Sequence, residues 1–162
     1  TPILGDDMAY FTSAHGIYRP LRCLRYSATG ALPPPYIQET NDGIALLHHR
    51  RVHYMQTPIL IGERLFGCDD RGALTCFKPQ DGTILFSERL KGNGFTASPV
   101  SDGHHLYVTS EGGKSWVIKV GDAYEEGGIY ELDDNCLATP AISEGTLFFR
   151  TQHFLLEIAE NG

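Results

Sequence analysis

Apolar and polar positions alternate along this chain in short runs, and each run is closed by Gly, Asp, Asn or Ser. Residues 57–86, "TPILIGERLFGCDDRGALTCFKPQDGTILF", contain four such runs. Short runs rich in Val, Ile, Leu, Phe and Tyr are typical of β-strands, and the bounding residues favour the tight turns of hairpins. No stretch shows a capped 3.6-residue apolar period, so we expect little helix. The pattern predicts strands over 57–61, 64–69, 73–78 and 83–90.

The same order of strands and turns occurs four times along the sequence. A hydroxyl residue followed by proline recurs at Pro2, Pro58, Pro99 and Pro140, at intervals of 56, 41 and 41 residues. Each pair introduces an apolar strand, a polar turn, a second strand, another turn and a third strand. Each proline stands at the start of a strand, where its missing N–H costs least. Self-similarity at such a period indicates a repeat architecture.

The repeats predict an all-β fold, a partial β-propeller of four consecutive four-stranded antiparallel blades, with the last blade lacking its outer strand. A period near 40 residues with four short strands is typical of a propeller blade. A lone sheet of this kind leaves both apolar faces in water, and blades stacked around an axis bury both. We interpret the chain as a single propeller segment, 1–162, with blades at approximately 1–56, 57–97, 98–138 and 139–162.

The remaining strands follow from the same pattern. They are 2–4, 8–13 and 21–26 in the first blade, 98–101, 105–110, 115–120 and 128–132 in the third, and 139–143, 146–151 and 154–158 in the fourth. The first blade also carries an insertion at 31–52, which contains "LPPPY" and is expected to be an exposed, extended loop. Gly43–His49 is expected to return as the outer strand of that blade. An inserted rim loop can carry function or be idle, and the sequence leaves both open.

Composition excludes some classes of partner. The 162 residues are 41% hydrophobic and 20% charged, with a net charge of −7. This balance argues against nucleic acid, since phosphate binding needs clustered Lys and Arg. No run approaches the roughly 20 apolar residues of a membrane helix, so no membrane span is expected. The four cysteines have no C-x-x-C spacing, and we interpret them as buried structural thiols, with one disulfide as the alternative.

Two stretches carry a family resemblance. "SPVSDGHHLYVTSEGG" at 98–113 and "GALTCFKPQDGTILF" at 72–86 resemble the PQQ-like, quinoprotein-type β-propeller repeat, which is also found in the outer-membrane assembly lipoproteins. The resemblance places Cys76 at the family's Ala, Gly82 in its Thr-Gly turn and Phe86 at its docking Trp. It implies that Phe86 packs onto the next blade, with Tyr130 as a substitute in the third blade.

The resemblance also implies a test for catalysis. Quinoprotein dehydrogenases of this fold hold the quinone between a Trp platform and an adjacent-Cys ring, with Ca²⁺ held by Glu and Asn and an Asp base. This sequence has no Cys-Cys pair, and its single Trp, Trp116, lies in the apolar strand "SWVIKV". Asp69-Asp70 and Asp133-Asp134-Asn135 have the character of turns rather than of a calcium loop. We therefore expect no catalytic residues, no metal and no cofactor, with PQQ and Ca²⁺ as the alternative.

The histidines offer weak alternatives only. His104-His105 are expected in a turn. His48 and His53 point opposite ways in an extended chain, which weakens a zinc site. His15 and His153 occupy equivalent turns, without further support for a two-histidine site.

These expectations lead to a functional hypothesis. PQQ-like rings usually carry seven or eight blades, so we expect a fragment of a larger propeller, completed by missing blades or by a second copy. We expect a non-catalytic protein-binding or scaffolding module in a bacterial, extracytoplasmic setting, by analogy alone. The alternative is part of a PQQ-dependent dehydrogenase whose cofactor site is completed by blades outside this sequence. A sugar-binding propeller is a third hypothesis, with Tyr36, Tyr54 and Tyr124 as candidates.

Overall fold

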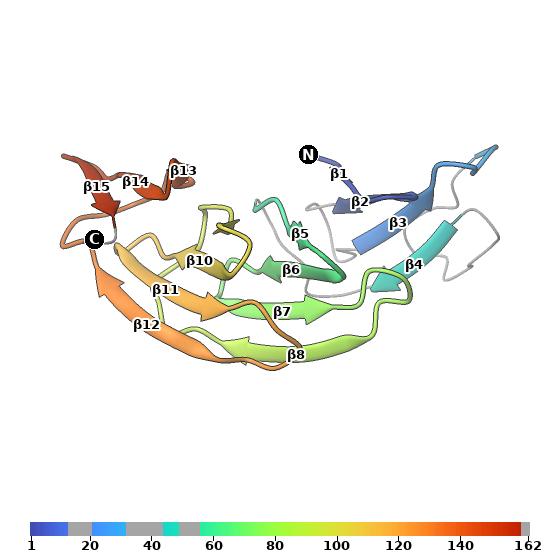
Figure 1. Cartoon of the computed structure of the whole chain (residues 1–162), viewed down its shortest axis with the longest axis horizontal. Coiled ribbons are helices and arrows are strands. Elements are labelled where there is room, and N and C mark those ends of the chain that lie inside the picture. The colour runs from blue at the N-terminus through green and yellow to red at the C-terminus, as the bar shows by residue number, and fades with distance from the viewer. Residues whose placement is uncertain (13–20, 32–43, 49–55, 160–162) are drawn as a thin grey trace.

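Four antiparallel β-sheets stand side by side along an arc (Figure 1). The computed structural model describes residues 1–12, 21–31, 44–48 and 56–159. None of these residues is helical. The predicted all-β fold and partial β-propeller are confirmed, and each sheet is one blade.

The two middle blades are complete four-stranded meanders. Blade two consists of β5 (Ile59–Ile61), β6 (Arg64–Cys68), β7 (Ala73–Phe77) and β8 (Ile84–Arg89). Blade three consists of β9 (Val100–Ser101), β10 (His105–Thr109), β11 (Lys114–Lys119) and β12 (Glu126–Glu131). Each of these strands begins within two residues of its predicted start: β5 and β9 begin two residues later, and β12 begins at Glu126 rather than at residue 128. A bulge between Val117 and Ile118 shifts the pairing there and extends the strand.

The two end blades differ from the middle ones. Blade one consists of β1 (Ile3–Leu4), β2 (Met8–Thr12), β3 (Leu21–Arg25) and β4 (Ile44–His48). Blade four has three strands among the described residues, β13 (Ala141–Ser143), β14 (Thr146–Arg150) and β15 (Leu155–Ala159). The returning outer strand predicted at 43–49 is present as β4. Most of the insertion at 31–52 lies outside the described residues, as do His15, His49, His53, Tyr36 and Tyr54.

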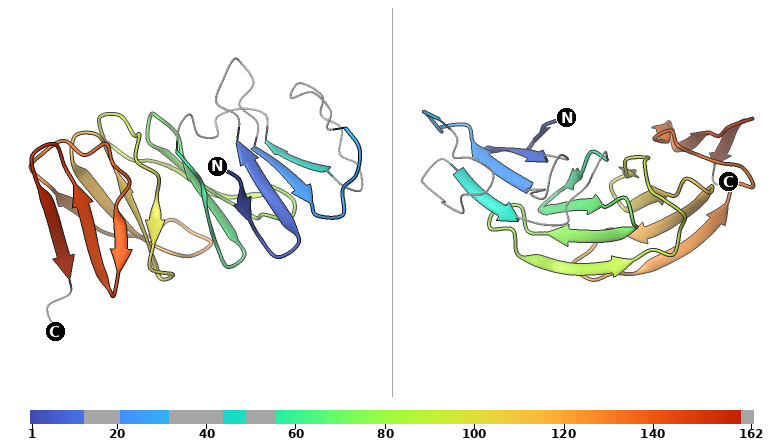
Figure 2. Two further views of the ribbon diagram at one scale, coloured as in Figure 1. Left: turned by 90° about the horizontal axis from the view of Figure 1, so that it is seen from above. Right: turned by 180° about the vertical axis from the view of Figure 1, so that it is seen from behind.

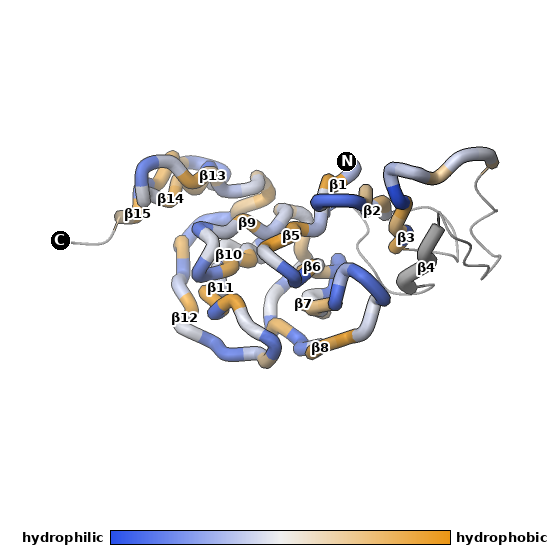
Figure 3. Tube along the Cα trace, turned by 45° about the vertical axis from the view of Figure 1, so that its right-hand side comes forward, coloured by the Kyte–Doolittle hydropathy of each residue, from blue (hydrophilic) through white to orange (hydrophobic). Residues whose placement is uncertain are grey.

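The strands of each blade run from the inside of the arc to its outside. The first strands, β1, β5, β9 and β13, line the concave side, and the outer strands β4, β8 and β12 follow the convex side (Figures 1 and 2). Hydrophobic stretches lie mainly in the strands, and hydrophilic stretches mark many of the turns between them (Figure 3).

Each sheet has two faces that pack against different neighbours. We call the face toward the earlier blade the preceding face and the face toward the later blade the following face. In blade two, Leu65 and Phe77 lie on the preceding face and join a cluster with residues of blade one. Phe66 is one position from Leu65 and Leu74 is three positions from Phe77, so both lie on the following face, and they join a cluster with residues of blade three.

The core between blades two and three is the larger of these clusters. It contains ten buried residues: Phe66, Cys68, Leu74, Cys76, Leu90, Phe95, Leu106, Val108, Trp116 and Ile118. Two of them, Leu90 and Phe95, come from the connection between the two blades. The connection is therefore part of the core, and it fixes the spacing of the sheets.

Two equivalent glycines allow this close approach. Gly72 and Gly113 lie in the second turns of blades two and three, with φ angles of +82° and +81°. A Cβ on Gly113 would lie 2.1 Å from the carbonyl oxygen of Asp134, which belongs to the connection to blade four. A side chain is therefore excluded there both by the backbone angle and by contact with the backbone.

We predict that Gly113→Ala destabilises the chain far more than Gly145→Ala. Gly145 has a φ of +77°, but nothing lies within 4 Å of an added Cβ, so this control carries the backbone strain alone. We expect a loss of about 1 kcal/mol for Gly145→Ala and of about 3 kcal/mol for Gly113→Ala in the free energy of unfolding. Urea denaturation measures both. Equal losses would contradict the role of the close approach.

Candidate functional site

The repeat prolines lie on the preceding faces. Pro58, Pro99 and Pro140 are buried, whereas Pro2 is exposed. Pro58 shares its face with Leu60, which packs against blade one. No blade among the described residues packs on the equivalent face of blade one, which accounts for the exposure of Pro2.

The hydroxyl residues before these prolines form a chain of hydrogen bonds from blade to blade. The N–H of Thr57 donates to Ser98 Oγ at 2.9 Å, and the N–H of Ser98 donates to Thr139 Oγ1 at 3.0 Å. Each bond joins residues 41 positions apart. Hydrogen bonds between equivalent residues fix the rotation of one blade on the next. We call this series the hydroxyl chain.

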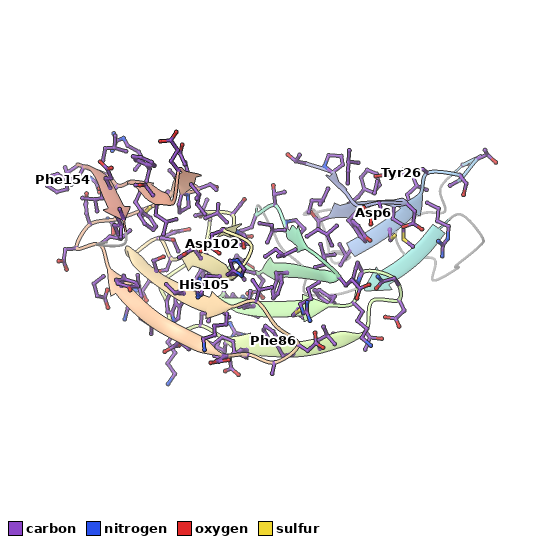
Figure 4. The ribbon with its side chains drawn as sticks, viewed as in Figure 1. Asp6, Tyr26, Phe86, Asp102, His105 and Phe154 are labelled. Atoms are coloured by element: carbon purple, nitrogen blue, oxygen red, sulfur yellow. The ribbon has the colours of Figure 1, made fainter. Side chains whose placement is uncertain are left out.

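Gly82 and Phe86 stabilise blade two and its contact with blade three. Gly82 has a φ of +72° and donates its N–H to the carbonyl of Lys78 at 2.9 Å, which closes the turn before β8. Phe86 lies 6.2 Å from Phe66 between ring centroids and 5.9 Å from Tyr124 of blade three. The structure thus places Phe86 against the next blade, at the outer side of the arc (Figure 4). Tyr130 is exposed and has no comparable place.

The side chains best suited to cofactor binding or nucleophilic chemistry, Trp116 and the cysteines, are buried in the core. Trp116 is buried and lies 5.6 Å from Phe95 between ring centroids. All four cysteines are buried, and none of them forms a disulfide. Burial raises the pKa of Cys23 to about 11 and of Cys76 to about 12. Thiols that stay protonated are poor nucleophiles and poor metal ligands, so these residues act as small hydrophobic side chains.

The following face of blade four is open. Leu155 is 71% exposed, while Leu74, at the equivalent position of blade two, is 0% exposed. Phe148, Arg150 and Glu157 share this face with Leu155, because they pair across β14 and β15 in the same register. Phe154 is also exposed and marks this end of the arc (Figure 4).

The preceding face of blade one is the second open face. Leu4 is 70% exposed, and it shares this face with Phe11 and Arg22. The neighbouring strand positions, Leu21 and Cys23, point the other way into the core with blade two. Two nitrogens of the Arg22 guanidinium, Nε and Nη2, are buried and have no hydrogen-bond partner among the described residues. Buried nitrogens without an acceptor carry a free-energy cost, so Arg22 is a strained charge at the border of this face.

Asp102 organises the first turn of blade three. Its Oδ1 accepts the N–H groups of His104 and His105 at 2.7 and 2.6 Å, and its Oδ2 accepts the hydroxyl of Tyr107 at 2.8 Å. Partial burial opposes ionisation, but these hydrogen bonds outweigh it and lower the pKa of Asp102 to about 2. His105 begins β10 and is half-buried, so the expected turn ends at His104.

Asp134 plays a similar part in the connection to blade four. Its Oδ2 accepts the N–H of His153 at 2.7 Å, and its Oδ1 lies 3.0 Å from Nδ1 of the same histidine. Asp69 likewise accepts the N–H groups of Arg71 and Ala73 at 2.9 and 2.8 Å. These carboxylates hold turns, as the sequence predicts for Asp69-Asp70 and for Asp133-Asp134-Asn135.

The described residues do not fit a quinone and calcium site. Trp116 is enclosed between two blades, so its ring face is not available as a platform. No group of three or more His, Cys, Asp or Glu residues in the described part of the chain could hold a metal ion. Within the same segments, no helix has the length and apolar character needed to cross a bilayer.

Sequence reasoning missed the features that mark the open ends. It placed the hydroxyl-proline pairs at strand starts but did not foresee the bonds between Thr57, Ser98 and Thr139. It also gave no role to Arg22 or Glu157. Comparison of equivalent positions would have shown both as charged residues where Trp116 and Cys76 stand in the inner blades.

Comparisons with known proteins bear on the fold. No family model and no curated protein matches the sequence. Among solved structures, BamB from Moraxella catarrhalis is similar with a TM-score of 0.69 at 11% identity, covering 94% of this chain and 42% of that chain. The chain therefore spans less than half the length of BamB.

Two further structures are similar. The computationally designed Ika4 protein has a TM-score of 0.67 at 9% identity, covering 99% of this chain and 89% of that chain. A europium-containing methanol dehydrogenase has a TM-score of 0.58 at 9% identity, covering 83% of this chain and 24% of that chain. At such identities the likeness shows the propeller fold alone.

We predict that Asp102→Asn reduces the acid sensitivity of the fold. A carboxylate whose pKa falls from 3.8 when unfolded to about 2 when folded contributes stability above about pH 4 and loses it as the pH falls toward 2. The free energy of unfolding, measured in urea at about pH 6 and about pH 2.5, should fall less in this variant than in the wild type.

The control is Asp6→Asn, in the equivalent turn of blade one, which leaves the Asp102 network intact. It should retain the wild-type decrease. An identical decrease in Asp102→Asn would show that the network contributes nothing to folding.

Proposed function

We propose that this chain is a non-catalytic, PQQ-like β-propeller module that binds protein, and that blade four accepts an extended segment of the partner. The observation that carries the proposal is the edge of β15. The other three blades have four strands, whereas blade four has three among the described residues, so β15 stands at the outside of its sheet. An exposed edge strand offers backbone N–H and C=O groups to another chain.

The side chains of β15 suit strand addition better than those of the other outer strands. Its sequence, "LLEIA", contains one charged residue, Glu157, and begins with the exposed Leu155. By contrast, β8 ends in Glu88-Arg89, and β12 begins and ends with glutamate. Charges on an edge discourage pairing, so β15 is the edge that an extended apolar segment would select.

The chemistry of the described residues supports binding rather than catalysis. The carboxylates of Asp69, Asp102 and Asp134 hold turns, and the thiols are buried with raised pKa values. The net charge of −7 disfavours nucleic acid as a partner. An extracytoplasmic setting follows from the resemblance to quinoprotein-type repeats, and it is part of the proposal.

A labelled peptide with the sequence of residues 81–90, "DGTILFSERL", tests the docking edge. This segment contains β8, which pairs with β7, and β7 is the equivalent of β15. We expect saturable binding by fluorescence anisotropy, weakened at least about tenfold by Leu155→Lys, because a charge at the edge opposes pairing. Tyr130→Lys, at an exposed position of β12, is the matched control and should bind as the wild type does.

Absence of saturable binding, or equal weakening by both variants, would remove the support for β15 as the docking edge. Both variants are expected to fold as the wild type does, because Leu155 and Tyr130 are exposed.

The dehydrogenase alternative has its own test. We expect equilibrium dialysis of the chain against PQQ with Ca²⁺ to show no retention of the quinone above a protein-free blank, because Trp116 is enclosed in the core. Retention at a fixed stoichiometry that Trp116→Phe abolishes would establish a quinone site and contradict the non-catalytic proposal.

A further inference from the structure

We propose that a second copy of this chain covers both open faces, so that two copies close one ring of eight blades. The following face of blade four in each copy would pack on the preceding face of blade one in the other. This goes beyond the proposed function, because it concerns the faces of the end sheets rather than the edge of β15.

The first argument is continuity with the interfaces inside the chain. The position of Leu155 is buried in the inner blades, as Leu74 in blade two and as Ser115 in blade three. The position of Pro2 is likewise buried in every later blade. Each open face is therefore a surface that the same repeat covers with a blade elsewhere, and the occupant that fits is another blade of this chain.

The second argument is charge complementarity. Phe11 pairs with Arg22 in blade one as Val108 pairs with Trp116 in blade three, so Arg22 and Trp116 are equivalent. Phe148 pairs with Glu157 in blade four as Phe66 pairs with Cys76 in blade two, so Glu157 is equivalent to Cys76.

Trp116 and Cys76 belong to the same core cluster, from opposite sides of the interface between blades two and three. Docking of blade one on blade four in the same geometry brings Arg22, which is half-buried, toward the exposed carboxylate of Glu157. Opposite charges then face each other across the contact, and the pair fixes its register.

The third argument is the hydroxyl chain. It runs from Thr57 through Ser98 and ends at Thr139 in the described residues. The next donor in the series is the N–H of Thr139, and Thr1 has the equivalent hydroxyl at the start of blade one. Docking in the proposed register continues the hydroxyl chain from Thr139 of one copy to Thr1 of the other.

Closure is compatible with the shape of the arc. The four blades turn along one arc whose ends lie apart (Figures 1 and 2). Two such arcs related by a two-fold axis give eight blades, within the range of known propellers, and bury both open faces of both copies.

Sedimentation equilibrium of the full chain tests the proposal first. We expect a species of twice the chain mass of 17.9 kDa. A monomer at all concentrations up to about 100 µM would overturn it, and would leave the faces to blades of another chain. A series of trimers and larger species would also overturn it, because an open chain of copies is not a ring.

Charge reversals then test the register. Arg22→Glu and Glu157→Arg should each weaken the dimer at least about tenfold, because each places like charges at both contacts. An equimolar mixture of the two variants should regain dimerisation, since one contact of the mixed dimer then keeps the wild-type pair and the other has the same pair with its charges exchanged. Glu88→Arg, on the outer strand β8, is the control and should dimerise as the wild type does.

Glu157 is exposed, so Glu157→Arg is expected to fold even if Arg22→Glu does not, and circular dichroism checks this. A dimer that Glu157→Arg leaves unaffected would overturn the proposal. The peptide assay reads the edge of β15 in the wild-type chain, so a wild-type chain that stays monomeric and still binds the peptide rejects the ring and leaves the proposed function standing.

Discussion

The structure depends on one constraint: each blade has two apolar faces and can bury them only against other blades. Leu65 and Leu74 of blade two illustrate this, since they are fully buried on opposite sides of one sheet. At about 25 cal/mol per Å² of buried apolar surface, a sheet exposed on both sides would lose most of its driving force for folding. Stability therefore belongs to the stack of blades, as in other repeat proteins.

Apolar packing alone does not set the angle between neighbouring blades, because it is not directional. Polar contacts between the blades set this angle. The hydroxyl chain joins the inner strands, while the guanidinium of Arg64 lies 2.7 Å from Asp122 of the next blade. Tyr124, two residues further on, contacts Phe86. Each contact is individually modest. Together they fix the angle between neighbouring blades. The close approach of Gly113 to Asp134 fixes the distance between blade three and the connection to blade four.

The strands could be predicted from the sequence because alternation and turn residues are local signals. The prediction of Trp116 as a core residue was correct for the same reason, since its strand is apolar on both sides. The contacts between blades could not be predicted in this way. The bond from Ser98 to Thr139 depends on how two sheets are rotated, and the open character of Leu155 depends on which neighbour is present. A pattern that is identical in every repeat carries no information on where the stack ends.

The end faces differ from the inner ones in a way that selects a partner. The following face of blade two carries Cys68 and Cys76, whereas the same positions in blade four are Arg150 and Glu157. A fully apolar end face would associate with any similar surface. A charged residue that needs a counter-charge accepts only a face that supplies it, because every other contact leaves the charge buried and unpaired. The charges on blade four therefore lower the affinity for wrong partners more than they lower the affinity for a face that presents Arg22.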